Sequence, residues 1–236
     1  MQLLTLPASL QNKSTFGVFH DFDHYVTADE FATVASDTGT ITVSDAVGGV
    51  VTLDPSDGTV ADNDETYLKG TKEIFLFASD KPLVFEARVK FAEANTDDAN
   101  ILVGLMDAVA ANSLVDDGAG PPASYSGLNF HKIDGGTKWL VESSVGTTQT
   151  TTTTDATAGG SAWQILRIEF QPVTSTEAEV SFFVDGVQAQ DSTGKEIKHR
   201  LTFTGATEMQ TALGVKNGGA NRETLNVDYV ACFQKR

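Results

Sequence analysis

The stretch WQILRIEFQPVTSTEAEVSFFVDG, residues 163–186, decides the fold. On each side of its polar middle, apolar residues occupy every second position: Leu166, Ile168, Phe170, Val180, Phe182 and Val184. A period of two puts such residues on one face of a β-strand. Pro172 cannot donate a ladder hydrogen bond, and residues 174–176 favour a turn. We therefore expect a long β-hairpin, followed by a tight turn at Asp185–Gly186 and a third strand.

The same alternation continues outside this hairpin. Residues 82–92 indicate a half-solvated antiparallel strand, residues 101–106 a central strand, and the threonine-rich residues 147–155 an edge strand. Gly, Pro and Asp separate these segments, and a short helix is suggested only at residues 107–114. The pattern predicts about a dozen strands in one all-β, antiparallel β-sandwich that spans residues 15–236.

The period of two also predicts which side chains form the core. We expect the following to be buried between the sheets: Phe85, Val89, Phe91, Leu102, Leu166, Ile168, Phe170, Phe182, Val184 and Tyr229. Cys232 is the only cysteine, so the chain has no internal disulfide, and its strand-like surroundings indicate a small buried hydrophobe. Packing of apolar side chains must therefore hold the fold together.

The chain carries a strong negative charge. Among its 236 residues, 32 Asp and Glu stand against 16 Lys and Arg, which gives a formal net charge of −16. Such a field repels nucleic-acid phosphates and anionic membranes, so we expect neither as a partner. The charge serves either solubility or an outward-facing surface in a crowded assembly. No apolar run approaches the roughly 20 residues that span a bilayer.

Residues 1–14 are expected to form a short irregular arm before the sandwich. Pro7 and the polar residues after it interrupt any regular helix. Four leucines of this arm are candidate docking residues: Leu3, Leu4, Leu6 and Leu10. Because an apolar patch is unfavourable in water, the arm lies either on a partner or across its own domain. The segment lacks the basic start of a secretory signal, so we expect synthesis and retention in a cytosol.

Signals of catalysis are weak in this sequence. It contains no nucleophile elbow, Walker loop, dinucleotide fingerprint or H-E-x-x-H motif. His20, His24, His131 and His199 are expected to be surface residues or hydrogen-bonded core residues. Carboxylates do not alternate on one core strand, as an acid pair facing a common cleft in a glycosidase would require. We therefore expect no enzymatic activity, no catalytic residue and no cofactor.

Two ligands remain possible from the sequence, a structural calcium ion and a sugar. The alternative in each case is that the chain binds neither. Acidic clusters at residues 62–65, 97–98 and 116–117 supply oxygen ligands that suit a structural calcium ion, although none matches an EF-hand loop. Three aromatic side chains would stack on a sugar if they were exposed: Tyr125, Trp139 and Trp163. Tryptophan in a sandwich more often belongs to the core, which is the simpler expectation.

Two segments resemble a known fold family. VSFFVDGV at residues 180–187 and NVDYVACF at residues 226–233 resemble the strand signatures of concanavalin A-like and laminin-G-like jelly rolls. This resemblance implies a concanavalin A-like jelly roll. The β-glucanases of the same superfamily carry an E-x-D-x-x-E motif on one strand. That motif is absent here, so the resemblance does not extend to their activity.

Five further segments make the chain similar to virion structural proteins of tailed bacteriophages: FHDF (19–22), KEIFLF (72–77), FEARVKF (85–91), ILVGLMDA (101–108) and VDDGAG (115–120). In those proteins a concanavalin A-like sandwich decorates the capsid. The resemblance implies a decoration or cement protein that binds the major capsid protein as a homotrimer. Its location would be the outer capsid surface of a virion assembled in the host cytoplasm. Two alternatives stay open: a carbohydrate-binding module of a phage tail or fibre, and a glycoside hydrolase with a divergent acid pair.

Overall fold

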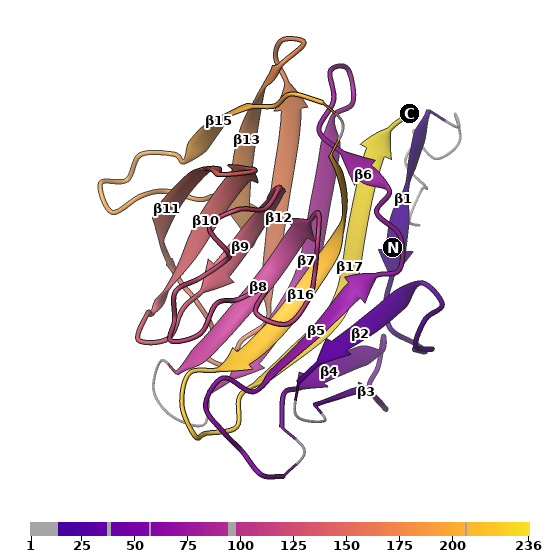
Figure 1. Cartoon of the computed structure of the whole chain (residues 1–236), viewed down its shortest axis with the longest axis vertical. Helices are drawn as coiled ribbons and strands as arrows, with labels where there is room; N and C mark the ends of the chain where they lie inside the picture. Colours follow the sequence, from indigo (N-terminus) through magenta and orange to yellow (C-terminus); the bar gives the residue numbers. More distant parts are fainter. Residues whose placement is uncertain (1–13, 37–38, 57, 94–97, 206) are drawn as a thin grey trace.

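The computed structural model describes residues 14–36, 39–56, 58–93, 98–205 and 207–236. Within these ranges the regular structure is all β, as the sequence predicts, and the named strands pair antiparallel throughout. Two sheets pack face to face as a β-sandwich (Figure 1). The same ranges hold no helix with the length and apolar character needed to cross a membrane.

The nine-stranded sheet has the order β14-β13-β12-β7-β17-β4-β3, with β1 paired to β17 and β15 paired to β13. Its strands are β1 (Thr15–His20), β3 (Thr40–Ser44), β4 (Val50–Asp54), β7 (Leu83–Ala92), β12 (Gln164–Pro172), β13 (Glu177–Val184), β14 (Val187–Gln188), β15 (Lys198–Thr202) and β17 (Thr224–Lys235).

The eight-stranded sheet has the order β11-β10-β9-β8-β16-β5-β2, with β6 paired to β16. Its strands are β2 (Phe31–Ala35), β5 (Glu65–Gly70), β6 (Phe75–Leu76), β8 (Ala99–Met106), β9 (Gly127–Lys132), β10 (Lys138–Val145), β11 (Thr148–Thr157) and β16 (Glu208–Asn217). The predicted central strand is β8, which is buried along its whole length, and the threonine-rich strand β11 lies at the sheet edge, as expected.

The expected hairpin is present as β12 and β13. Its apolar residues pair in register, with Leu166 opposite Val184, Ile168 opposite Phe182, and Phe170 opposite Val180. Asp185 and Gly186 both have positive φ, 51° and 79°, as a type I′ turn requires. The chain then returns as the short strand β14.

Seven of the predicted core residues are buried between the sheets: Phe85, Val89, Phe91, Leu166, Ile168, Phe170 and Phe182. Aromatic contacts join the two layers, because the Phe182 ring meets Phe130 edge-on at 5.6 Å and Phe91 meets Trp139 at 5.8 Å. Cys232 is a free thiol buried in the same core, as the sequence predicts.

Tyr229 was expected in the core but is only half-buried. A β-bulge in β17 explains the difference, since Val227 pairs with Val89 whereas Tyr229 pairs with the preceding residue of β7, Arg88. The extra residue, Asp228, reverses the alternation from that point on, so the Tyr229 ring lies on the outer face of the sheet.

Two other core predictions need correction. Val184 is half-buried at the rim of the core. Leu102 is fully buried, but on the other face of the eight-stranded sheet. There it belongs to a second apolar cluster: Tyr67, Leu102, Met106, Val109, Leu114, Tyr125 and Ala212. This second cluster lies under the long loop of residues 107–126.

Residues 107–114 do not form the short helix that the sequence suggests. The loop backbone instead donates hydrogen bonds to side chains of β5: Asn112 N to Glu65 Oε1 (2.8 Å) and Leu114 N to Tyr67 Oη (2.9 Å). These contacts satisfy backbone donors that would otherwise need a helix or water.

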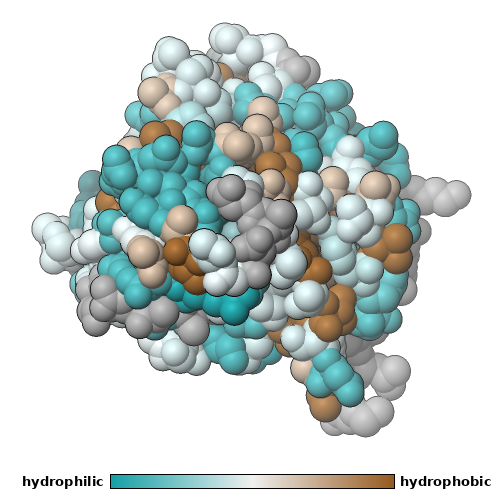
Figure 2. Space-filling model, turned by 60° about the horizontal axis from the view of Figure 1, so that its bottom comes forward, coloured by the Kyte–Doolittle hydropathy of each residue, from teal (hydrophilic) through white to brown (hydrophobic). Residues whose placement is uncertain are grey.

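The surface is mainly polar. In the view of Figure 2, apolar residues (brown) lie in small groups among hydrophilic ones (teal). The large apolar side chains most open to solvent are Phe19, Val26, Val47, Val173 and Val187. Of these, Phe19 is the only aromatic residue, and it lies beside the cleft described next.

Candidate functional site

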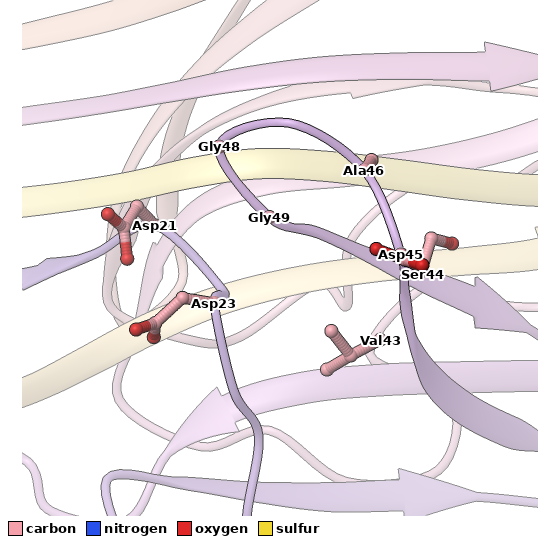
Figure 3. Close-up of a pocket in the computed structure, with 8 residues that line it drawn as sticks. All are labelled: Asp21, Asp23, Val43, Ser44, Asp45, Ala46, Gly48 and Gly49. Carbon is pink, nitrogen blue, oxygen red and sulfur yellow. The ribbon is translucent and has the colours of Figure 1, made fainter.

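An open cleft lies where β1 ends and the β3–β4 hairpin turns (Figure 3). Its volume is about 460 Å³, within the size range of small-ligand sites. Asp21 and Asp23 come from the segment after β1, and the remaining lining comes from the facing hairpin: Val43, Ser44, Asp45, Ala46, Gly48 and Gly49. Three carboxylates therefore line one cleft.

Phe22 fixes the directions of the two aspartates that flank it. Its side chain is fully buried, with ring centroids 4.7 Å from His20 and 5.7 Å from Phe31. Its backbone is left-handed (φ 52°), which is an uncommon and strained state for a bulky residue. With Phe22 anchored inward, Asp21 and Asp23 remain exposed on either side of it.

The hairpin turn closes the other wall through two glycines. A Cβ on Gly49 would lie 2.4 Å from the Asp21 carbonyl oxygen, so only glycine allows this approach. Gly48 and Gly49 both have positive φ, 91° and 79°. A Cβ on Gly48 would meet only Asp228 Oδ1, at 3.8 Å. The bulge residue of β17 therefore also borders this cleft.

Two aromatic rings lie near the cleft, because Phe19 precedes Asp21 by two residues and Tyr229 follows Asp228. Phe19 is 59% exposed and stacks on Tyr229 with ring centroids 6.1 Å apart. Strand alternation puts Phe19 on the same face as Asp21. Tyr229 donates a hydrogen bond to Glu86 (2.8 Å), and burial together with this bond raises the pKa of Tyr229 well above its usual range. The phenol therefore stays a fixed neutral donor.

The predicted histidines His20 and His24 do meet, with ring centroids 5.1 Å apart. His20 Nδ1 accepts a hydrogen bond from Phe22 N (2.9 Å), which supports the strained turn. His24 Nδ1 lies 2.5 Å from Asp23 Oδ1, and this bond raises the pKa of His24. His20 therefore supports the turn that positions Asp21 and Asp23, and His24 pairs with Asp23.

The other two histidines are hydrogen-bonded core residues, as expected. His199 contacts Ser143 Oγ and Thr152 Oγ1, each at 3.0 Å. His131 Nδ1 lies 2.9 Å from Asn129 Oδ1, and burial lowers the pKa of His131 to about 3. A neutral His131 therefore belongs to the structure of the sheet.

A second polar cluster, not foreseen from the sequence, lies on the outer face of the eight-stranded sheet. Tyr125 donates a hydrogen bond to Glu142 (2.6 Å) and accepts one from Asn129 (2.7 Å), and Thr151 also donates to Glu142. These residues lie on, or just before, the consecutive strands β9, β10 and β11, and only the pairing of those strands brings the side chains together. Loop 107–126 covers the cluster, and burial raises the pKa of Tyr125. The group is closed to a polysaccharide in this conformation.

The same loop is fastened by Lys216, which is fully buried. Its ammonium group donates to Asn112 Oδ1 (2.7 Å) and Leu114 O (2.9 Å), and it pairs with Glu65 (3.4 Å) and Asp116. The sequence suggests Asp116 as a calcium ligand, but in the structure its carboxylate pairs with the ammonium group of Lys216.

The remaining sequence candidates are placed as follows. Among the described residues, no group of three or more His, Cys, Asp or Glu side chains is arranged to hold a metal ion. Tyr125 and Trp139 are buried, and Trp163 is half-buried beneath the cations of Arg88 and Lys90. None of these three rings is open to a sugar. Leu3, Leu4, Leu6 and Leu10 lie outside the described residues, as does Asp97.

No protein-family model and no curated protein matches the sequence. Solved structures match over nearly the whole chain. The carbohydrate recognition domain of Emp47p has 11% identity and a TM-score of 0.60, covering 93% of this chain and 95% of that one. An endo-1,3-β-glucanase from Streptomyces sioyaensis has 16% identity and a TM-score of 0.61, covering 94% and 97%. Peanut lectin has 9% identity and a TM-score of 0.60, also covering 94% and 97%.

These likenesses establish the fold. The chain is a lectin-like jelly roll of the concanavalin A type, as its strand signatures imply. Proteins of this shape include both sugar-recognition domains and glycan-active enzymes. The shape alone therefore does not choose between binding and catalysis.

Proposed function

We propose that this protein is a non-enzymatic carbohydrate-binding module. Its site is the cleft of Asp21, Asp23 and Asp45 together with the Phe19–Tyr229 ring pair. The observation that carries the proposal is an aromatic pair, the exposed Phe19 on the half-buried Tyr229, near a carboxylate-lined cleft of ligand size. Carboxylates accept hydrogen bonds from sugar hydroxyls, and an aromatic face suits the apolar side of a sugar ring.

The charge of the cleft selects the kind of glycan. Its lining holds three aspartates and neither lysine nor arginine. A uronate or sulfated sugar would bring like charge against these carboxylates, which disfavours binding. The ligand class is therefore a neutral or amino-bearing glycan that supplies hydrogen-bond donors.

A glycan array followed by calorimetry on the best neutral oligosaccharide tests this proposal. Phe19→Ala should weaken binding about 2- to 10-fold, the range of a lost ring contact. Val26→Ala is the control, since Val26 is equally open (58% against 59% for Phe19) but belongs neither to the ring pair nor to the cleft lining. The absence of neutral glycans among the binders, or equal effects of the two variants, would refute the site.

The absence of catalysis is tested on the same glycans. We expect no release of reducing ends, because the covered Glu142 cluster excludes a chain and the cleft aspartates are open to solvent. Turnover that a single carboxylate substitution abolishes would make the protein an enzyme.

The second candidate function is decoration of a tailed-phage capsid. It rests on the sequence resemblance, and the bond from Tyr125 of loop 107–126 to Glu142, which leaves Glu142 covered, is compatible with it. A trimer on the outer surface would bind the major capsid protein through Leu3, Leu4, Leu6 and Leu10. The acidic chain would face away from packaged DNA.

Deletion of residues 1–14 tests this candidate. The truncated protein should stay folded by circular dichroism and fail to bind expanded heads that lack the native protein. Binding equal to that of the full chain would remove the arm as the anchor. If the protein binds glycans and does not bind such heads, only the carbohydrate-binding function remains.

A further inference from the structure

The outer face of the nine-stranded sheet has a charge unlike the rest of the molecule. Strands β7, β12, β13 and β15 carry five of the 16 basic residues: Arg88, Lys90, Arg167, Lys198 and Arg200. They carry only four of the 32 acidic residues: Glu86, Glu169, Glu177 and Glu179. Five minus four gives this face +1, so the remainder of a chain of −16 carries −17.

Most of these charges are paired within the face. Lys198 meets Glu179 at 2.8 Å and Arg200 meets Glu177 at 2.6 Å, each across β13 and β15. On β12, Arg167 lies 3.2 Å from Glu169. A surface paired in this way presents little net field to an approaching molecule.

Cation–aromatic contacts lie on the same face, one in its middle and one at the start of β12. The Arg167 guanidinium lies 4.4 Å from the Phe183 ring centre. Arg88 and Lys90 lie 4.7 and 5.0 Å from the centre of the Trp163 ring. Tryptophan and arginine are the residues that most often dominate binding energy at protein interfaces. We call the outward side of β7, β12, β13 and β15 the cation–aromatic face.

This face is open and large enough for a protein partner. Along β7 and β12 its side chains are exposed or half-buried, and no described element lies over them. It spans four strands about 4.8 Å apart and about eight residues long on average, roughly 500 Å² in plan. Standard interfaces bury about 800 Å² on each partner and weak ones less than about 600 Å², so this face suits a weak dimer.

We propose that the cation–aromatic face pairs with the same face of a second copy, forming a twofold homodimer. Two copies that approach through other surfaces bring strong like charge together, which opposes contact. The cation–aromatic face instead offers each copy a nearly neutral, aromatic surface. A face that pairs with itself closes as a dimer, which differs from the trimer implied by phage resemblance. The carboxylate-lined cleft lies beyond β17, and its neighbour Tyr229 bonds to Glu86 at the border of the face.

Sedimentation velocity on the full chain, from about 1 to about 100 µM, tests the pairing. The wild type should pass from monomer to dimer in this range. Val84→Glu, on the cation–aromatic face, should raise the dimer dissociation constant at least about 10-fold. Ile74→Glu is the matched control, since the two side chains are 41% and 38% exposed and Ile74 lies outside the face. Phe183→Glu provides a second variant at the centre.

Each outcome decides the proposal. A wild type that stays monomeric, or a dimer that Val84→Glu and Ile74→Glu weaken equally, overturns it. A monomer that dimerises only after deletion of residues 1–13 would assign the face to the chain's own arm and also overturns it. Circular dichroism of each variant confirms that the sandwich is intact. Glycan binding should be the same in all of them, which separates this test from that of the cleft.

Discussion

Two buried histidines lie on strands of opposite sheets, His131 on β9 and His199 on β15. Burial lowers the pKa of His131 to about 3 and that of His199 to about 4. Between about pH 4 and 6.5 the folded state keeps both neutral, whereas the unfolded chain protonates them. The unfolded state then binds more protons, so the free energy of unfolding falls as the pH is lowered. We expect about 1.4 kcal/mol per pH unit from each histidine.

Urea unfolding across this pH window, on the wild type and on His131→Gln, measures the effect. Glutamine does not titrate, so the variant should lose about half of the slope that the histidines cause. The carboxylates contribute equally to both proteins and cancel in the comparison. Equal slopes would mean that His131 titrates in the folded state as it does in the unfolded chain.

Phe182 tests the packing that joins the two layers. Its ring is fully buried and meets both Phe130 and His199 edge-on. Phe182→Ala should lower the free energy of unfolding by about 3–5 kcal/mol, because transfer energy is lost and a cavity remains. A loss near zero in urea melts would contradict the packing described here.

At the scale of elements, the β3–β4 turn depends on one glycine more than on its neighbour. Gly48 and Gly49 both have positive φ, so alanine at either costs about 1–2 kcal/mol in backbone strain. Only at position 49 would the added Cβ strike the backbone of Asp21 and Phe22. Gly49→Ala should therefore cost about 1–3 kcal/mol more than Gly48→Ala, the usual range for overpacking. Thermal unfolding of the two variants makes the comparison, and equal losses would show that the turn does not press on residues 21–22.

The loop over the eight-stranded sheet depends on Lys216. Lys216→Met leaves the buried Glu65 without its cation and should cost about 3–5 kcal/mol. Adding Glu65→Gln removes the orphaned charge, so the double variant should be more stable than Lys216→Met alone. Urea unfolding of the wild type, both single variants and the double variant measures this coupling. A double variant that loses the sum of both single effects would show that the pair does not interact.

The alternation of apolar and polar residues predicts strands well where one face of the strand is solvated and the other is buried. It places β7, β12 and β13, since Leu83 to Phe91 and Leu166 to Phe170 alternate without interruption. It fails at Asp228, because a bulge depends on the partner strand and leaves no local pattern. It fails again at residues 107–114, where the backbone bonds to Glu65 and Tyr67 of a distant strand.

For the whole molecule, the sandwich follows from sequence whereas the site does not. The cleft needs residues 21–23 beside residues 43–49, with Asp228 of the last strand at its border. Such contacts arise only after the sheets assemble. The backbone of Phe22 is left-handed, and no neighbouring residue in the sequence predicts that conformation. The exposure of Phe19 depends on the pairing of β1 with β17, which sequence alone does not give.

The last prediction concerns the boundary between arm and sandwich. Strand β1 begins at Thr15 and pairs with β17 through six residues, and Arg236 N donates to Ser14 O (2.8 Å). Removal of residues 1–13 keeps all of these contacts, so the free energy of unfolding should change by no more than about 0.5 kcal/mol. Removal of residues 1–20 also takes away the stack of Phe16 on Phe75 and frees the edge of β17.

An unpaired edge strand of that length is a template for association, so the longer truncation should aggregate. Light scattering and urea unfolding of both truncations decide the matter. A large stability loss from removing residues 1–13 would make the arm part of the fold, and the domain would then begin before Thr15. A soluble, stable protein lacking residues 1–20 would instead place β1 outside the cooperative unit.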